Sequence, residues 1–309
     1  MTWARLAFRL QPSPIGFAAV VCLGLAGAAA WLAMNMRSML ERCETSGAAE
    51  DCGVIHVFDS PMGEPAMMLQ LVIGLAMYGV PLVLGVPVVT REIEQRTAMI
   101  AWPLAGSRLR WLAWRAAPVL VIGLVLIGVM AVAAEALAGI NAPDSDLGFA
   151  AHGVRGISLM TRAGLMLVVA VALGAATGRL LPSLMIGIAL AVGLSTAVGY
   201  LPPYGVEPTE LVLSGSDFAG GQPFVTGLAY RDPDGRPIGE DEANAMRMAV
   251  YEEYSPDLPP DSVLPQDVFY GIAGSRYSEV LARESAVLVG ATVLVGGVAA
   301  AVVQRRRPE

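Results

Sequence analysis

The chain has 309 residues, of which 55% are hydrophobic and only 15% are charged, with a mean hydropathy of +0.59 and a net charge of −7. A soluble domain carries about 25% charged residues. The apolar residues here form blocks of membrane-spanning length, so the composition excludes an ordinary soluble protein and indicates an integral membrane protein. All 20 basic residues are Arg. The missing lysine argues against an ATP-binding loop of the GxxxxGK[ST] type, which needs lysine at the nucleotide phosphates.

Six apolar runs are long enough to span a bilayer. A spanning helix needs about 20 mostly apolar residues at roughly 1.5 Å each. The runs, in chain order, are Ile15–Met34, Met67–Val89, Ala117–Ala138, Ile157–Gly178, Leu180–Leu201 and Ser285–Val303. The fourth contains Arg162, which must either extend to the interface or lie in a site lined by protein. A very short turn joins the fourth and fifth, so these two are expected to form a hairpin of full or partial depth.

The arginines orient this arrangement. The N-terminal tail, the loop Thr90–Ala117, Arg179 and the C-terminal tail hold 11 Arg and 3 Glu, a net charge of +8, whereas the rest carries 9 Arg and 24 acids, a net charge of −15. Positively charged loops stay in the cytoplasm, so we expect both termini to be cytoplasmic. Loops 37–66 and 139–156 and the segment 202–284 are then expected outside.

Two cysteines lie in the first outer loop. Cys43 and Cys52 flank an eight-residue stretch and could oxidise to a disulfide outside the cytoplasm. The alternative is two free thiols whose backbone geometry does not allow bridging.

The outer segment 202–284 is acidic and rich in Pro and Gly. Residues Phe224–Tyr230 and Arg236–Ile238, joined by a Pro-Asp-Gly turn, predict a β-hairpin. Acidic residues 240–242 before Ala243–Tyr254 predict a short helix, because acids suit the positive end of a helix dipole. A helix is expected to enter the last span from Ser275. Two interpretations stay open, a small extracellular domain and an irregular loop packed on the helix ends.

The cytoplasmic loop Thr90–Ala117 carries most of the functional inference. Residues Arg91–Ala101 can form a short amphipathic helix, with Glu92 and Arg96 as an i, i+4 pair. Ser107 can cap the next helix. Side chains expected to anchor the loop at the membrane interface are Trp102, Arg108, Arg110, Trp111, Trp114 and Arg115. An ordinary positively charged loop with an aromatic belt would account for the same residues.

The sequence of this loop resembles the pattern of one protein family. The run Gly85-Val86-Pro87, followed by Arg91-Glu92-Ile93-Glu94, Thr97, Ala101-Trp102 and Arg110-Trp111-Leu112-Ala113, is similar to ABC-2 type transporter permeases, closest to the subset common in actinobacteria. The resemblance extends to Gly174, Gly178 and Leu180-Leu181-Pro182, to the outer hairpin and to residues 270–279. Arg96 departs from the pattern, because the family usually has Gly there.

The resemblance implies an all-α integral membrane protein with six transmembrane helices, both termini inside, a short cytoplasmic coupling helix between spans 2 and 3, and a small α+β extracellular segment between spans 5 and 6. The expected divisions are 1–201 with the coupling loop 90–117, the extracellular segment 202–284, and 285–309 with the last span and basic tail. The resemblance further implies that the loop contacts an ATPase through Arg91, Glu92, Glu94 and Thr97. We expect Arg96, which departs from the family pattern, to belong to the same contact.

The implied function is the permease subunit of an ABC exporter in the cell membrane, moving an amphipathic or hydrophobic cargo. It is not itself an enzyme and holds no cofactor, while ATP and Mg would bind the partner ATPase. Expected partners are nucleotide-binding subunits, a second permease and membrane lipid, with no nucleic acid. The alternative is a membrane sensor or scaffold whose outer segment binds an extracellular ligand or partner. Only two histidines occur, His56 and His152, both in expected outer loops, so a metal site or an intramembrane protease is not expected.

Overall fold

A computed structural model describes eight stretches of the chain, namely 12–45, 63–95, 97, 106–141, 147–200, 204–211, 221–254 and 264–305. The chain divides into two compact units. The first, the helical unit, is Met1–Pro143, Ala151–Leu201 and Leu281–Glu309. The second, the sheet unit, is Asp144–Ala150 and Pro202–Val280.

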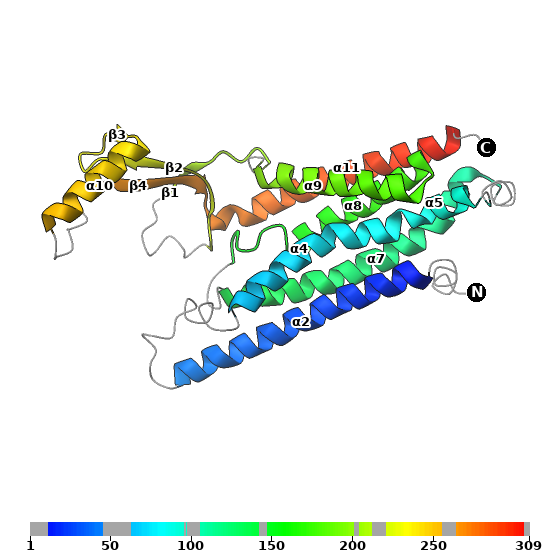
Figure 1. Ribbon diagram of the computed structural model, residues 1–309, viewed down its shortest axis with the longest axis horizontal. Coiled ribbons are helices and arrows are strands. Elements are labelled where there is room, and N and C mark those ends of the chain that lie inside the picture. The colour runs from blue at the N-terminus through cyan, green and yellow to red at the C-terminus, as the bar shows by residue number, and fades with distance from the viewer. Residues whose placement is uncertain are drawn as a thin grey trace. The chain divides into compact units, whose positions relative to one another are not determined.

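Six helical stretches are long and apolar enough to cross a membrane, judged by length and composition. They are α2 (Pro12–Thr45), α4 (Gly63–Gly85) with its continuation α5 (Pro87–Glu94), α7 (Arg108–Ala138), α8 (Gly156–Thr177), α9 (Leu180–Tyr200) and α11 (Tyr277–Arg305) (Figure 1). A short 3-10 turn, η1 (Gly139–Asn141), follows α7. Each predicted apolar run coincides with one of these six candidates among the described residues, although α8 ends at Thr177, one residue before its run, and Leu201 lies outside the described residues.

Several helices extend beyond the apolar run that predicted them. Helix α2 continues to Thr45, into the stretch that we expected as an outer loop from Arg37. Hydropathy marks only the apolar part of a helix, whereas polar residues such as Arg42 can continue it; the Arg42 Nε donates to the Ser38 carbonyl at 2.8 Å. Cys52 and the side chain of Cys43 lie outside the described residues, so the disulfide stays a prediction.

Helix α8 packs closely on the junction between α4 and α5 because small residues face it. A Cβ atom added to Gly85 would lie 2.7 Å from the Ala170 Cβ, and one added to Gly174 would lie 2.7 Å from the Val86 carbonyl oxygen. Both distances are too short for real atoms. In a membrane, where water does not drive helices together, such close backbone approach is a main source of helix association.

The turn between α8 and α9 confirms the expected hairpin of spans 4 and 5. Gly178 ends α8 in the left-handed conformation (φ 67°), and its amide donates to the Gly174 carbonyl at 3.0 Å. Residues other than glycine rarely adopt these angles. Helix α9 then starts at Leu180 and is 21 residues long, enough for a full span.

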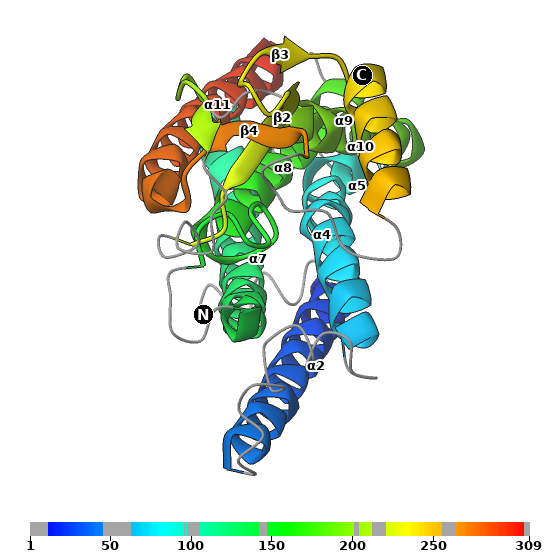
Figure 2. The ribbon, with the colours of Figure 1, turned by 90° about the vertical axis from the view of Figure 1, so that its left-hand side faces the viewer.

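The described part of the sheet unit contains four antiparallel strands and the helix α10. The strands β1 (Thr209–Leu211), β2 (Phe224–Arg231), β3 (Pro237–Ile238) and β4 (Gln266–Ile272) have the order β1-β4-β2-β3. Figure 2 labels β2, β3 and β4. Helix α10 (Glu240–Tyr254) packs on β2, and the short turn η4 (Gly274–Arg276) precedes α11. The predicted hairpin and helix are confirmed. Strand β4, which pairs with both β1 and β2, was not predicted.

The core of the sheet unit includes a residue from the link between α7 and α8. Phe149 is 6% exposed and packs edge-on to Tyr277, with ring centroids 5.3 Å apart, and against Phe224 at 5.6 Å. Its amide also donates to the Gln222 carbonyl at 2.8 Å. The link predicted as a plain connection therefore supplies part of the fold of the second unit.

Candidate functional site

The second span passes from α4 into α5 at Pro87. Proline has no backbone N–H, so it cannot continue the hydrogen bonds of α4. The chain stays helical because Val86 keeps helical angles (φ −59°, ψ −47°) and its carbonyl accepts from the amide of Thr90 (3.4 Å) and from its hydroxyl (3.0 Å). The apolar run predicted over Met67–Val89 therefore lies within one continuous helical stretch, Gly63–Glu94.

The helix predicted over Arg91–Ala101 is also corrected. Helix α5 begins at Pro87 and ends at Glu94, because proline is a favourable first helical residue and the chain turns after Glu94. There the Gln95 amide donates to the Arg91 carbonyl at 3.0 Å, and the Thr97 hydroxyl donates to the Glu92 carbonyl at 3.2 Å. These bonds satisfy carbonyls that the end of a helix leaves open. Arg96 and residues 98–101 lie outside the described residues.

Glu92 joins α5 to the start of α7. Its carboxylate accepts a hydrogen bond from the Trp111 indole Nε1 at 3.1 Å and forms an ion pair with Arg115. The Glu92 side chain is only 13% exposed, and Ile93 beside it packs on the core of the bundle. Its described charge partner is thus on α7, and the predicted pair with Arg96 involves a residue that the structure does not describe.

Glu94 joins α5 to the start of α9. Its Oε1 accepts from the backbone amide of Leu180 at 2.7 Å. A carboxylate at this position also faces the positive end of the α9 dipole. Two carboxylates of a single short helix therefore connect it to two different spans. The structure places both in contacts within the chain, and their contact with an ATPase stays a prediction.

The residues predicted to anchor the loop at the membrane interface differ in how exposed their side chains are. Trp111 is 4% exposed and lies inside the bundle rather than at its surface, because its indole is held by Glu92. Trp114 is 41% exposed, which suits an anchor. Arg108 Nη1 donates to the Gln304 carbonyl near the end of α11 at 2.7 Å, and Arg110 is exposed. Trp102 lies outside the described residues. The cap predicted at Ser107 is confirmed, because its hydroxyl accepts from the Arg110 amide at 3.2 Å.

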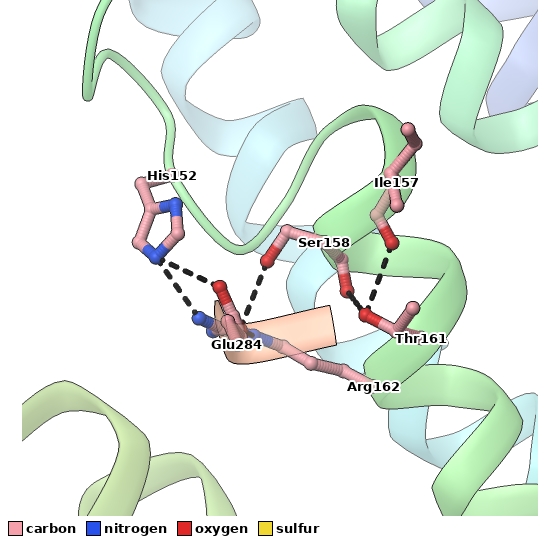
Figure 3. Close-up of polar contacts among 6 residues, drawn as sticks. All are labelled: His152, Ile157, Ser158, Thr161, Arg162 and Glu284. Carbon is pink, nitrogen blue, oxygen red and sulfur yellow. Dashed lines mark hydrogen bonds and ion pairs between the residues drawn. The ribbon is translucent and has the colours of Figure 1, made fainter. Parts of the chain in front are cut away.

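A second candidate site is a buried charged cluster between α8 and α11 (Figure 3). Glu284 on α11 is fully buried, and its Oε1 accepts from the Arg162 Nε at 2.6 Å and from the Ser158 hydroxyl at 3.1 Å. The other carboxylate oxygen lies 3.2 Å from the His152 Nε2. The same Nε2 is 3.4 Å from the Arg162 Nη2. Arg162 is thus held in a site lined by protein, which was one of the two alternatives for it.

The turn before α8 makes room for this cluster through its glycines. Gly153 has φ +88°, and a Cβ atom added there would lie 2.1 Å from the Arg162 Nη1. Gly156 has φ +51°, and a Cβ atom there would lie 2.7 Å from the Glu135 Oε2. Glu135 forms an ion pair with Arg155, which is 3% exposed. This second pair connects the end of α7 to the start of α8, so both arginines of the segment are neutralised.

The cluster fastens α8 to α11 and carries no sign of catalysis. Burying two charges in an apolar region is costly, and it is tolerated here because the pair is close and the Glu284 Oε1 also accepts from the Ser158 hydroxyl. Our reading of the sequence missed this site. It placed Glu284 at the end of the outer segment and His152 in an outer loop. An arginine within an apolar run, Arg162, indicates that an acidic partner is nearby in the fold. No local sequence pattern identifies that partner, because Glu284 is 122 residues away.

Comparison with known families supports the resemblance noted in the cytoplasmic loop. The model of the family described as "ABC-2 membrane transporter related" matches residues 18–201, more than half of the chain, from α2 through α9. No curated protein and no solved structure matches the chain significantly. The matched range contains α5 with its ties to α7 and α9, whereas Glu284 lies beyond it. The chain therefore belongs to the ABC-2 membrane transporter related family and is a multi-pass membrane protein of the permease type found in ABC transporters.

Proposed function

We propose that this chain is the permease subunit of an exporter driven by a separate ATPase, and that the motion of the ATPase enters through α5. The observation that carries the proposal is the pair of ties made by α5. Glu92 connects it to Trp111 and Arg115 on α7, and Glu94 connects it to the first amide of α9. A displacement of α5 would therefore move three spans. These are α7 and α9, to which its carboxylates bind, and α4, which α5 continues.

The residues of α5 and of the chain directly after it have different roles. Thr97 is exposed, and Arg91 is only partly buried, so these two are suited to meet an ATPase surface, together with Arg96, which is expected to belong to the same contact. Glu92 and Glu94 would instead transmit the movement to the spans, because their carboxylates are engaged within the chain. This division separates binding of the ATPase from coupling to it.

The close packing of α8 supports the transmission of force. Gly85 and Gly174 let α8 lie against the α4–α5 junction without intervening side chains. Such a contact is stiff because packed interiors are not freely deformable. The buried pair of Arg162 and Glu284 would then carry the movement from α8 to α11.

The orientation follows from charge. Positive loops remain in the cytoplasm, so the termini, α5 and the start of α7 would face the ATPase inside the cell. The sheet unit would lie outside. The assembly would contain two permease subunits and two ATPases, with ATP and Mg bound by the ATPases, and the cargo would be amphipathic or hydrophobic. No specific observation in the structure favours the sensor or scaffold alternative.

The test is co-purification from native membranes with matched variants. Arg91→Glu should reduce the amount of ATPase that purifies with the protein. Glu94→Gln should leave that amount unchanged but reduce ATP-driven transport of a fluorescent amphipathic dye in reconstituted vesicles. Arg37→Glu, on the exposed end of α2, is the charge-reversal control. Absence of any ATPase with the unaltered protein would refute the proposal. Equal loss of ATPase in both α5 variants would refute the division of roles.

A further inference from the structure

An apolar cleft runs between α7, α8 and α11 in the helical unit. Its volume is ≈ 480 Å³, within the range of about 300–1,000 Å³ typical of ligand pockets. Small residues on the two facing helices create it, since they leave the space between α7 and α11 unfilled. Residues that define it are Ala113, Ala116, Ala117, Val168, Gly296 and Ala300.

The lining of the cleft is almost entirely apolar. Thr292 is the single polar residue in its lining, and the Thr292 hydroxyl donates to the Leu288 carbonyl of the same helix at 2.7 Å. Only the methyl group of Thr292 is then left for the cleft. A molecule that fills the cleft must therefore present hydrocarbon to it, because a polar group there would lose its hydrogen bonds.

Two arginines stand at one end of the cleft. Leu109 is the first α7 residue in the lining, and successive helix residues are about 100° apart. Arg108 and Arg110 therefore flank the lining face of α7 on either side. Arg108 also contacts the Gln304 carbonyl at 2.7 Å, which places it where the ends of α7 and α11 meet. No carboxylate of the described residues forms an ion pair with Arg110.

We propose that this cleft binds one hydrocarbon chain of an anionic membrane phospholipid, with the phosphate at Arg108 and Arg110. The apolar lining would bind the hydrocarbon chain of the lipid, and the two arginines would bind its negatively charged head group. Under the orientation given with the proposed function, on which this step rests, the arginines face the cytoplasmic leaflet, where anionic lipids are concentrated. The lipid fills the gap beside α11 and holds this helix to α7 and α8 at the end opposite Glu284.

The test is native mass spectrometry of the purified full chain after exchange into detergent with phosphatidylglycerol or phosphatidylcholine of identical acyl chains. The unaltered protein should retain phosphatidylglycerol in preference to phosphatidylcholine. The double variant Arg108→Gln/Arg110→Gln should bind phosphatidylglycerol about tenfold to thirtyfold more weakly, since each arginine near a membrane surface contributes a factor of several.

A second variant tests the cleft itself. Ala117 lines the cleft and is exposed, so Ala117→Phe should fill it without disturbing the core and should abolish the retained lipid. Controls are Arg37→Gln and Ala28→Phe on the exposed surface of α2, which should retain lipid as the unaltered protein does.

Three results would overturn the proposal: equal retention of the two lipids, retention unchanged by Ala117→Phe, or a change in oligomer mass with Ala117→Phe, which would mean that a second copy of the chain covers the cleft. The amount of ATPase that co-purifies is read separately. Loss of lipid preference with normal ATPase association contradicts only this inference, and absence of ATPase contradicts only the proposed function.

Discussion

Removing the charge of Glu284 should destabilise the helical unit more than any other single change of an acid among the described residues. The Glu284 carboxylate is fully buried and accepts hydrogen bonds from the Arg162 Nε at 2.6 Å and from the Ser158 hydroxyl at 3.1 Å. In Glu284→Gln the side chain keeps its shape but leaves the Arg162 guanidinium buried without a counter-charge. Breaking a buried pair in this way costs about 3–5 kcal/mol, and we expect a loss of this size.

A double-mutant cycle separates the pair from its surroundings. Arg162→Gln should also be destabilising, since it leaves the carboxylate unpaired. The double variant Glu284→Gln/Arg162→Gln removes both charges and should recover most of the loss, because two neutral amides can bond to one another at lower desolvation cost. We expect each single variant to cost roughly 2–4 kcal/mol more than the double variant.

The measurement is reversible unfolding of the purified protein in mixed micelles, followed by the loss of helical circular dichroism as denaturant is added. Glu279→Gln is the matched control. Glu279 lies near the start of α11, and its pair with Arg276 is exposed, at 38% and 41% of the side chains, so its loss should cost less than about 1 kcal/mol. The reasoning fails if Glu284→Gln costs no more than this control, or if the costs of the two single variants simply add in the double variant.

Three further changes test other parts of the helical unit. Gly153→Ala places a Cβ atom 2.1 Å from the Arg162 Nη1 at a residue with φ +88°, and we expect a loss of about 1–3 kcal/mol in the same unfolding assay; a stability equal to that of the unaltered protein would contradict the geometry of the turn. Gly174→Ala brings a Cβ atom within 2.7 Å of the Val86 carbonyl, so a cysteine cross-link between α5 and α8 should form more slowly, and an unchanged rate would mean that the helices are not in close contact. Glu94→Ala removes the acceptor for the first amide of α9 and should lower the free energy of unfolding by about 0.5–2 kcal/mol. Hydrogen exchange of the amides at the start of α9 should become faster, and an unchanged exchange rate would exclude the hydrogen bond between Glu94 and Leu180.

Local pattern was sufficient for several elements. Hydropathy located every span, because burial in a bilayer requires about 20 consecutive apolar residues whatever the neighbours are. Ser107 marked the start of α7, since a hydroxyl before a helix has a local partner, the Arg110 amide at 3.2 Å. The Pro-Asp-Gly turn predicted the β2–β3 hairpin, because a two-strand hairpin is specified by its own turn.

Elements whose partners are distant in the chain were not predicted correctly. Strand β4 pairs with both β1 and β2, and no local feature of residues 266–272 reveals those partners. The end of α5 was misplaced because the apolar spacing of residues 93, 97 and 100 favoured a longer helix, whereas Pro87 and the turn at Gln95 determined its bounds. Trp111 was expected at the membrane surface, since its burial depends on Glu92 reaching it from another helix.

The sequence by itself determined that this protein lies in a membrane, how many spans it has and, through the cytoplasmic loop, its family. These properties depend on composition, run length and short motifs, which act over a few turns of chain. Only the tertiary structure decided what the charged residues of the helical unit do. Glu92, Glu94 and Glu284 have partners on other helices. For Glu92 and Glu284 the physical reason is burial, because an acid in an apolar bundle is stable only where the packing brings a donor to it. The same packing left the cleft between α7, α8 and α11 open, which no pattern along a single helix could have revealed.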